Sequence, residues 1–160
     1  MHMIGRREFL LAGGATAAVA ALGTGIPLSV AEDDAGGGRS PQFAWAYRNV
    51  VGEAVPEEAY VTLDLPEIAE NGNTVPYKLE VESPMTEADY VKNLHLLSTA
   101  NPQPAVATFH FTPQSGKATV AGRMRLAKTQ DVVAIAETNG GKLFIGKRNV
   151  NVVIGGCGNE

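Results

Sequence analysis

The sequence contains one cysteine, Cys157, in its closing stretch NVVIGGCGNE. Gly155 and Gly156 precede the cysteine and Gly158 follows it. Glycine has more backbone freedom than any other residue, so these three glycines predict a flexible arm over residues 154–160. Four residues of extended chain reach roughly 14 Å, which would carry the thiol clear of a folded domain. We therefore expect the arm to present its thiol to other proteins.

The neighbours of Cys157 give the thiol no electrostatic activation. No Lys, Arg or His lies beside it, and Glu160 follows three residues later. At roughly 8 Å in water a negative charge disfavours the thiolate by about 0.5 kcal/mol. The pattern therefore favours a carried substrate that a partner's active site activates, over a self-contained catalyst. Two alternatives remain open: a structural disulfide between two chains, and a cysteine without a role.

The remaining residues do not assemble into a recognisable enzyme or metal site. His95 and His110 fall in separate predicted strands and point away from their apolar neighbours, so we expect them on outward or interface faces. Their spacing matches no zinc pattern, and the sequence has no nucleophile elbow, phosphate loop or dinucleotide fingerprint. A net charge of −4 without a basic stripe argues against nucleic-acid binding. We predict a non-enzymatic protein without metal or cofactor.

The first 31 residues are typical of an export signal. Arg6 and Arg7 precede a mildly apolar run over residues 9–26. Ser29 and Ala31 then form the small-x-small pattern that precedes a signal-peptide cleavage site. The paired arginines indicate the twin-arginine pathway, with cleavage after Ala31. We therefore expect a periplasmic protein that has no membrane segment after cleavage. Residues 32–40 are acidic and then glycine-rich, which predicts a flexible leader.

One short helix is predicted directly after the leader. Ser40 is a good N-cap, Pro41 suits the first helical turn, and Gly52 is placed to end the helix. Phe43 and Tyr47 would share its apolar face. The folded domain is therefore expected to begin at residue 41 and to end at 153.

Beyond the helix, apolar residues alternate with polar ones, which predicts seven strands. Turn residues separate the runs, and Asn139-Gly140 gives the strongest hairpin signal. Pro76 suits an edge strand or a strand start, and Gly146 suits a bulge. Seven short, evenly spaced strands predict an immunoglobulin-like antiparallel β-sandwich. The runs cover residues 59–65, 74–82, 90–99, 105–113, 117–128, 131–137 and 142–156.

Taken together, these segments resemble the SoxY family, the sulfur-carrier subunit of the periplasmic thiosulfate-oxidising (Sox) system. The resemblance covers the chain from about residue 59 to 158. Besides the twin-arginine start, it is carried by ENGNTVP at residues 70–76, ATFHFTP at 107–113, RLAKTQ at 125–130 and GGCG at 155–158. The family commonly ends on Gly-Gly-Cys-Gly-Gly, whereas Asn159 and Glu160 close this chain.

The resemblance implies a fold, an attachment site and a set of partners. It implies an immunoglobulin-like subunit that pairs with a second β-sandwich subunit, SoxZ, and holds sulfur intermediates on Cys157. A c-type cytochrome complex would load thiosulfate oxidatively, a manganese-dependent hydrolase would release sulfate, and a molybdenum-haem sulfane dehydrogenase would oxidise the remaining sulfur. His110, Arg123 and Arg125 point outward on the predicted strands and are candidates for the surface that docks a partner.

Overall fold

The computed structural model describes residues 39–156 of the chain. The predicted signal peptide, most of the leader and the residues from Cys157 to Glu160 lie outside the described part. Over residues 39–156 the chain forms one α-helix, one short 3₁₀ helix and eight strands. The helices of residues 39–156 lack the length and the apolar character that a membrane span needs.

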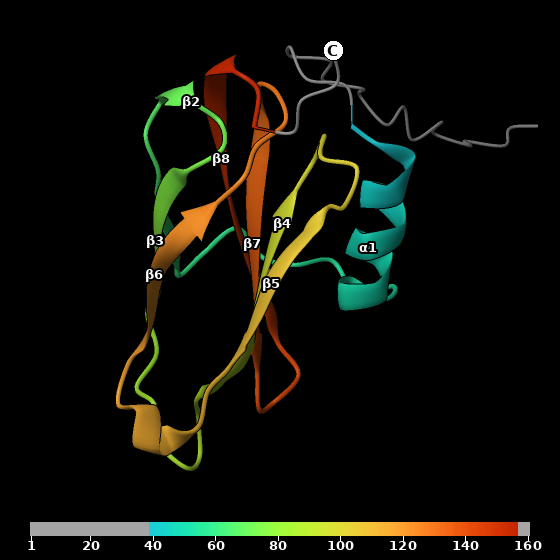
Figure 1. Ribbon diagram of the computed structural model, residues 1–160. Helices are drawn as coiled ribbons and strands as arrows, with labels where there is room; N and C mark the ends of the chain where they lie inside the picture. Colours follow the sequence, from blue (N-terminus) through green and yellow to red (C-terminus); the bar gives the residue numbers. More distant parts are fainter. Residues whose placement is uncertain (1–38, 157–160) are drawn as a thin grey trace, which may run out of the picture. The chain divides into compact units, whose positions relative to one another are not determined.

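The strands form two sheets (Figure 1). One sheet has three strands in the order β1-β3-β6, and the other has five in the order β2-β8-β7-β4-β5. The three-stranded sheet contains β1 (Val61–Asp64), β3 (Val75–Val81) and β6 (Ala118–Met124). The five-stranded sheet contains β2 (Ile68–Asn71), β4 (Val91–Ser98), β5 (Ala105–His110), β7 (Gln130–Thr138) and β8 (Leu143–Ile154).

The main core lies between the two sheets. Strand β3 alternates buried and exposed residues along its whole length, and Leu79 at its centre is fully buried. Leu94 and Leu96 of β4 enter the same core from the five-stranded sheet. Facing apolar sides with polar outer sides are the pattern of a β-sandwich. The predicted immunoglobulin-like sandwich is confirmed.

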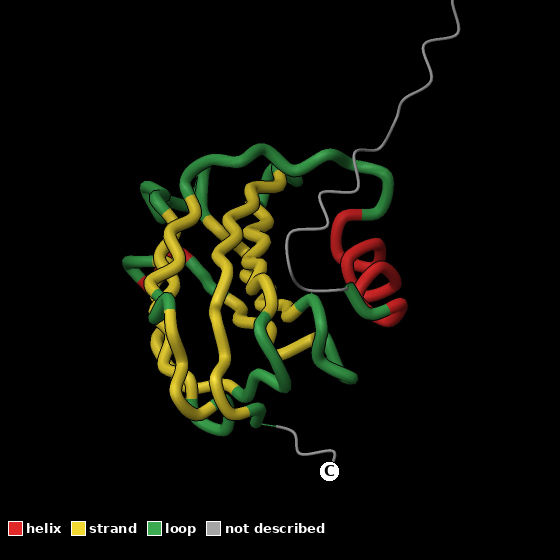
Figure 2. Tube along the Cα trace, turned by 90° about the horizontal axis from the view of Figure 1, so that it is seen from above, coloured by secondary structure: helices red, strands yellow, loops and turns green. Residues whose placement is uncertain are grey.

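Helix α1 (Pro41–Val51) covers part of the outer face of the five-stranded sheet (Figures 1 and 2). It begins as predicted: the Ser40 Oγ accepts a hydrogen bond from the Phe43 N–H at 3.2 Å. Gly52 ends the helix with a φ of 61°, a conformation that glycine adopts without strain. A second, smaller core forms beneath the helix; its buried residues are Phe43, Ala46, Val51, Leu97, Val133 and Ile135.

The structure contains an eighth strand that the sequence did not predict. Strand β2 pairs parallel to β8, with Ala69 opposite Val152 and Asn71 opposite Ile154. It is four residues long and buries only Ala69, so it carries no readable alternation. The prediction of a purely antiparallel sandwich is therefore wrong at this one pair.

Three local predictions have different outcomes. The hairpin at Asn139-Gly140 is confirmed, because the next residue, Gly141, has a φ of 78° in the turn between β7 and β8. Pro76 is the second residue of β3, which confirms a strand start, but β3 is a central strand and not an edge.

The predicted bulge at Gly146 is wrong, because the ladder with β7 continues without a shift. A Cβ there would lie 2.6 Å from Leu63 Cδ1 of the facing sheet, so close approach explains this glycine.

The main core predicts a large effect for Leu79→Ala. Truncating a fully buried leucine loses apolar burial and leaves a cavity, so we expect the free energy of unfolding to fall by about 2–5 kcal/mol. Urea unfolding followed by circular dichroism measures it. Val55 is 93% exposed, and Val55→Ala is the control, with an expected change within about 0.5 kcal/mol. Equal losses in the two variants would contradict the assignment of the core.

Candidate functional site

The candidate site is the base of the C-terminal arm, where β8 ends. Ile154 is the last residue of β8, within the last predicted strand and at the first residue of the predicted arm. The following Gly155 and Gly156 are the last residues that the structure describes, and Gly156 is buried. Cys157 and Gly158, the other predicted site residues, lie outside the described residues. The structure therefore describes the site only as far as Gly156, the residue before Cys157.

Two backbone hydrogen bonds join the arm base to two neighbouring segments, and a third joins those segments to each other. The Gly72 N–H, in the turn between β2 and β3, donates to the Ile154 carbonyl at 2.7 Å. The Leu126 N–H, just after β6, donates to the Gly72 carbonyl at 2.8 Å. The Gly156 N–H in turn donates to the Leu126 carbonyl at 2.8 Å. Gly156 is thus bonded into the fold through Leu126.

Glycine is the only residue type that fits at these contacts without a backbone shift. A Cβ on Gly156 would collide with the Gly72 carbonyl and lie 2.6 Å from the Asn73 N. A Cβ on Gly155 would collide with the Ala127 carbonyl, and one on Gly72 would lie 2.7 Å from the Gly156 N. These obstacles are backbone atoms, which cannot rotate away as a side chain can. The predicted flexibility of the arm glycines stays a prediction, and close packing is a separate reason for glycine at the first two.

Two buried amides hold the segment after β6 from inside the fold. The Asn101 Nδ2 donates to the Arg125 carbonyl at 2.8 Å, and the Ala127 N–H donates to Asn101 Oδ1 at 2.9 Å. The Gln130 Nε2 donates to the same Asn101 oxygen at 2.8 Å. Gln130 is fully buried, and buried amides are stabilising only when their hydrogen bonds are made. The network therefore fixes the loop that contacts the arm base.

Thr129 fixes the same loop from the side of β8. Its Oγ1 accepts a hydrogen bond from the Val152 N–H at 3.0 Å and donates to Asn151 Oδ1 at 3.0 Å. Two motifs on which the family resemblance depends, at residues 70–76 and 125–130, therefore meet at the base of the arm. Sequence reasoning missed Asn101, which lies in a turn 26 residues from the Ala127 that it binds.

Three exposed aliphatic side chains lie on β2 and β8, the two strands that lead to the arm base. Ile68 of β2 and Val153 and Ile154 of β8 are 60%, 66% and 64% exposed. The parallel pairing of β2 with β8 brings them to the same end of the five-stranded sheet. Because water disfavours exposed aliphatic groups, this surface, which we call the aliphatic rim, favours contact with another protein.

The two predicted histidines lie on the outer face of the five-stranded sheet, as expected. The amide oxygen Oδ1 of Asn93 only accepts, so the His110 Nδ1–H donates to it at 2.6 Å. The Asn93 Nδ2 donates to Glu137 at 2.6 Å, and His95 Nδ1 lies 3.1 Å from the Thr108 hydroxyl. Among residues 39–156, no group of three acidic, His or Cys side chains is arranged to hold a metal ion.

The other candidate docking residues lie on a different sheet. Arg123 is on β6 and Arg125 follows it, and both are exposed as predicted. His110 is on β5, at the edge of the five-stranded sheet. The fold therefore does not place the arginines and His110 on one sheet.

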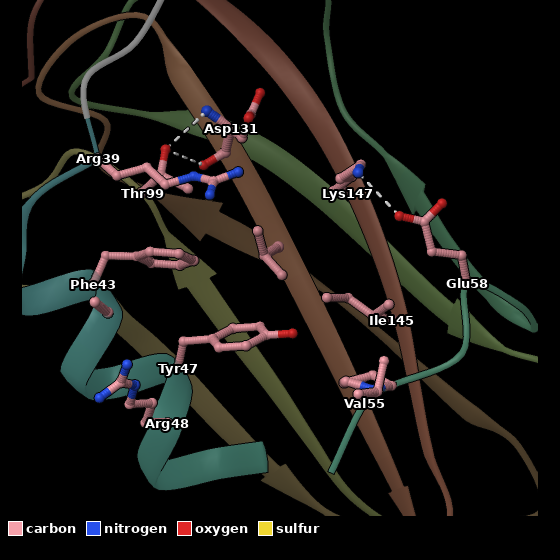
Figure 3. A pocket seen from close by; sticks show the side chains of 13 residues that line it. Arg39, Phe43, Tyr47, Arg48, Val55, Glu58, Thr99, Asp131, Ile145 and Lys147 are labelled. Carbon is pink, nitrogen blue, oxygen red and sulfur yellow. Dashed lines mark hydrogen bonds and ion pairs between the residues drawn. The ribbon is translucent and has the colours of Figure 1, made fainter. Parts of the chain in front are cut away.

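A groove of about 410 Å³ lies between α1 and strands β7 and β8 (Figure 3). Phe43 and Tyr47 line it from the helix, and Ile145 lines it from β8. At its edge Lys147 forms an ion pair with Glu58 at 2.9 Å, and this hydrogen-bonded carboxylate raises the pKa of Lys147. Among residues 39–156, no cysteine or histidine lines this groove.

The loop network predicts that Asn101→Ala destabilises the domain. The variant leaves the Ala127 N–H and the Gln130 amide without their partner, and each unmade buried bond costs about 1–3 kcal/mol. We expect the free energy of unfolding to fall by about 2–4 kcal/mol in urea titrations. The control is Gln103→Ala, at an exposed position two residues after Asn101 in the turn between β4 and β5. Its expected change is within about 0.5 kcal/mol. If Asn101→Ala lowers the free energy of unfolding no more than the control does, the hydrogen bonds of Asn101 do not stabilise the loop after β6.

His95 predicts how stability depends on pH. Burial lowers the pKa of His95 below its ordinary 6.5, the Glu137 carboxylate opposes this, and His110 adds to it. Below pH 6.5 the unfolded chain binds a proton at His95 that the folded chain resists, so stability decreases as pH falls. We expect His95→Gln to lose less stability than the parent between about pH 7.5 and about pH 5.5. Urea midpoints at both pH values measure this, and parallel losses would contradict it.

Comparisons with known proteins identify the family. The family model of the sulfur oxidation protein SoxY matches residues 47–157. The solved sulfur carrier protein SoxY from Chlorobium limicola f thiosulfatophilum is 32% identical, with a TM-score of 0.57 over 67% of this chain and 88% of that one. A search of the curated proteins found no match.

Other solved structures share the fold alone. A superoxide reductase (neelaredoxin) from Ignicoccus hospitalis is 18% identical, with a TM-score of 0.53 over 60% of this chain and 82% of that one. A putative superoxide reductase from Thermotoga maritima is 16% identical, with a TM-score of 0.51 over 60% and 87%. The family match spans the sandwich, both loops at the arm base and the single cysteine: this chain belongs to the SoxY family of sulfur oxidation proteins.

Proposed function

We propose that this protein is a sulfur-substrate carrier in thiosulfate oxidation, which holds thiosulfate-derived intermediates covalently on Cys157. The observation that carries the proposal is the family match, which ends on residue 157, the only cysteine in the sequence. The 32% identity to a solved SoxY sulfur carrier supports it. The protein itself is then not an enzyme, because the chemistry takes place in the partners that act on the thiol.

The first step joins the sulfane sulfur of thiosulfate to the Cys157 sulfur. A sulfur–sulfur bond forms, the thiol loses its proton, and two electrons pass to the c-type cytochrome complex. Hydrolysis by the manganese-dependent partner then releases the terminal sulfone as sulfate and leaves a sulfane sulfur on the carrier. The sulfane dehydrogenase accepts the electrons removed from that sulfur as oxygen atoms from water convert it to a sulfonate. A second hydrolysis then releases this group as sulfate and frees the thiol. Because Glu160, the nearest charged residue in the sequence, is acidic, we expect the thiol to depend on these partners for activation.

The proposal includes a partner subunit and a compartment. A SoxZ-like β-sandwich subunit would form a heterodimer with this chain, and His110, Arg123 and Arg125 remain candidates for the surface involved. The twin-arginine signal predicted over residues 1–31 supports periplasmic export, and this pathway transports folded proteins together with bound partners. The sulfur chemistry would then take place outside the cytoplasm.

Mass spectrometry of the carrier tests the covalent role. We expect the full chain, isolated without reductant from cells oxidising thiosulfate, to carry thiosulfonate and sulfane adducts on the peptide that contains Cys157. We expect Cys157→Ser to carry none and to abolish thiosulfate oxidation in those cells. The matched control is Ser98→Cys, which places a thiol at a fully buried position in the Cys157→Ser background and should not restore loading.

Two results would overturn the carrier role. One is normal thiosulfate oxidation by cells whose only copy is Cys157→Ser. The other is a chain that is wholly disulfide-linked in those cells, as non-reducing gels would show, which would favour the alternative of a structural interchain disulfide at Cys157.

A further inference from the structure

The base of the arm has more contacts than a free tether needs. The Gly156 amide is bonded to Leu126, and Gly155 and Gly156 pass so close to Ala127 and Gly72 that a Cβ on either glycine would collide with backbone. Flexibility alone requires only small side chains, whereas these contacts exclude every side chain. The contacts therefore indicate that Gly155 and Gly156 are glycines because they pack directly against the backbone of the domain.

We propose that Gly72, Leu126 and Ala127 form a clamp that holds Gly155 and Gly156 against the domain in the free carrier. Any motion of the arm relative to the domain would then start after Gly156, and not at the end of β8. This inference rests on the proposed carrier function for its biological meaning, but the clamp itself is a property of this chain's backbone.

The clamp is rigid because three parts of the fold support it. Asn101 binds the loop on both sides of Leu126, and Thr129 binds the same loop to β8. Gly72 closes the circuit, since it donates to Ile154 and accepts from Leu126. A shift of any one segment would break bonds to the other two, so the arm base keeps its position as long as the sandwich is folded.

The clamp determines how far the carrier can extend its thiol. A trans peptide separates consecutive Cα atoms by about 3.8 Å, so a pivot at Gly156 leaves Cys157 within one such step of the clamp. A pivot at Ile154 would allow roughly 10 Å over the same residues. With Gly156 held, an enzyme that acts on the thiol would work close to the end of β8, where Val153 and Ile154 are exposed. The clamp therefore limits the distance between the Cys157 backbone and the end of β8.

Nitrogen-15 relaxation of the free, full-length chain with reduced Cys157 tests the clamp directly. We expect the Gly155 and Gly156 amides to have order parameters near about 0.85, like the rigid backbone of β8. We expect the Gly156 N–H to exchange with solvent at least about tenfold more slowly than an unstructured amide. Order parameters below about 0.6 at both glycines would overturn the clamp.

One alanine variant and two alanine controls test whether the contacts of Gly156 keep the arm base rigid. Gly156→Ala should lower the order parameters of residues 155 and 156 below about 0.6 while thermal unfolding stays close to the parent, because the sandwich core is untouched. Gly158→Ala makes the same change on the other side of Cys157 and should leave Gly156 ordered. Gly140→Ala controls for alanine elsewhere, since a Cβ there meets only Thr138 Oγ1 at 3.8 Å. An arm base that stays rigid in Gly156→Ala would overturn the proposal.

The test separates the clamp from the carrier function. Relaxation reads the order of the arm base without partner enzymes or sulfur substrate, whereas the carrier role is tested by adducts on Cys157. A rigid arm base without adducts would leave the clamp in place and remove the proposed function. Adducts on a chain whose two glycines are disordered would do the reverse.

Discussion

Apolar packing between the three-stranded and five-stranded sheets is the constraint on which the rest of the structure depends. Leu79 from one sheet and Leu94 and Leu96 from the other are fully buried in this core. Their burial fixes the spacing of the two sheets, and hence where connections between them cross. The turn from β2 to β3 and the segment from β6 to β7 are such connections, and both come to the end of β8. Core packing thus determines the point where the arm leaves the fold.

Side-chain hydrogen bonds hold the connecting loops in place near the end of β8. A loop that crosses between sheets leaves backbone donors and acceptors without ladder partners, and buried ones have to be satisfied elsewhere. Asn101 and Gln130 supply those partners inside the fold, and Thr129 supplies them toward β8. In the part of the chain that the structure describes, no buried side-chain nitrogen or oxygen lacks a hydrogen bond. The arm therefore starts from a well-fixed support.

This arrangement divides the work of a carrier between two kinds of structure. The sandwich provides a stable body with a second core beneath α1, and among residues 39–156 it holds no cluster of side chains suited to bind a metal. The arm base provides a fixed exit beside the aliphatic rim.

The sequence by itself determined the class of fold, the helix with its Ser40 cap and Gly52 end, seven of the strands and the single thiol at Cys157. Those features follow from local periodicity, capping chemistry and composition, which are readable within a few residues. Only the tertiary structure decided the parallel β2, the close approach at Gly146 and the contacts of Gly72, Asn101 and Gly156. Each depends on which backbone segments meet across the sandwich. Such meetings are set by packing between residues far apart in the chain, and local sequence carries no direct signal of them.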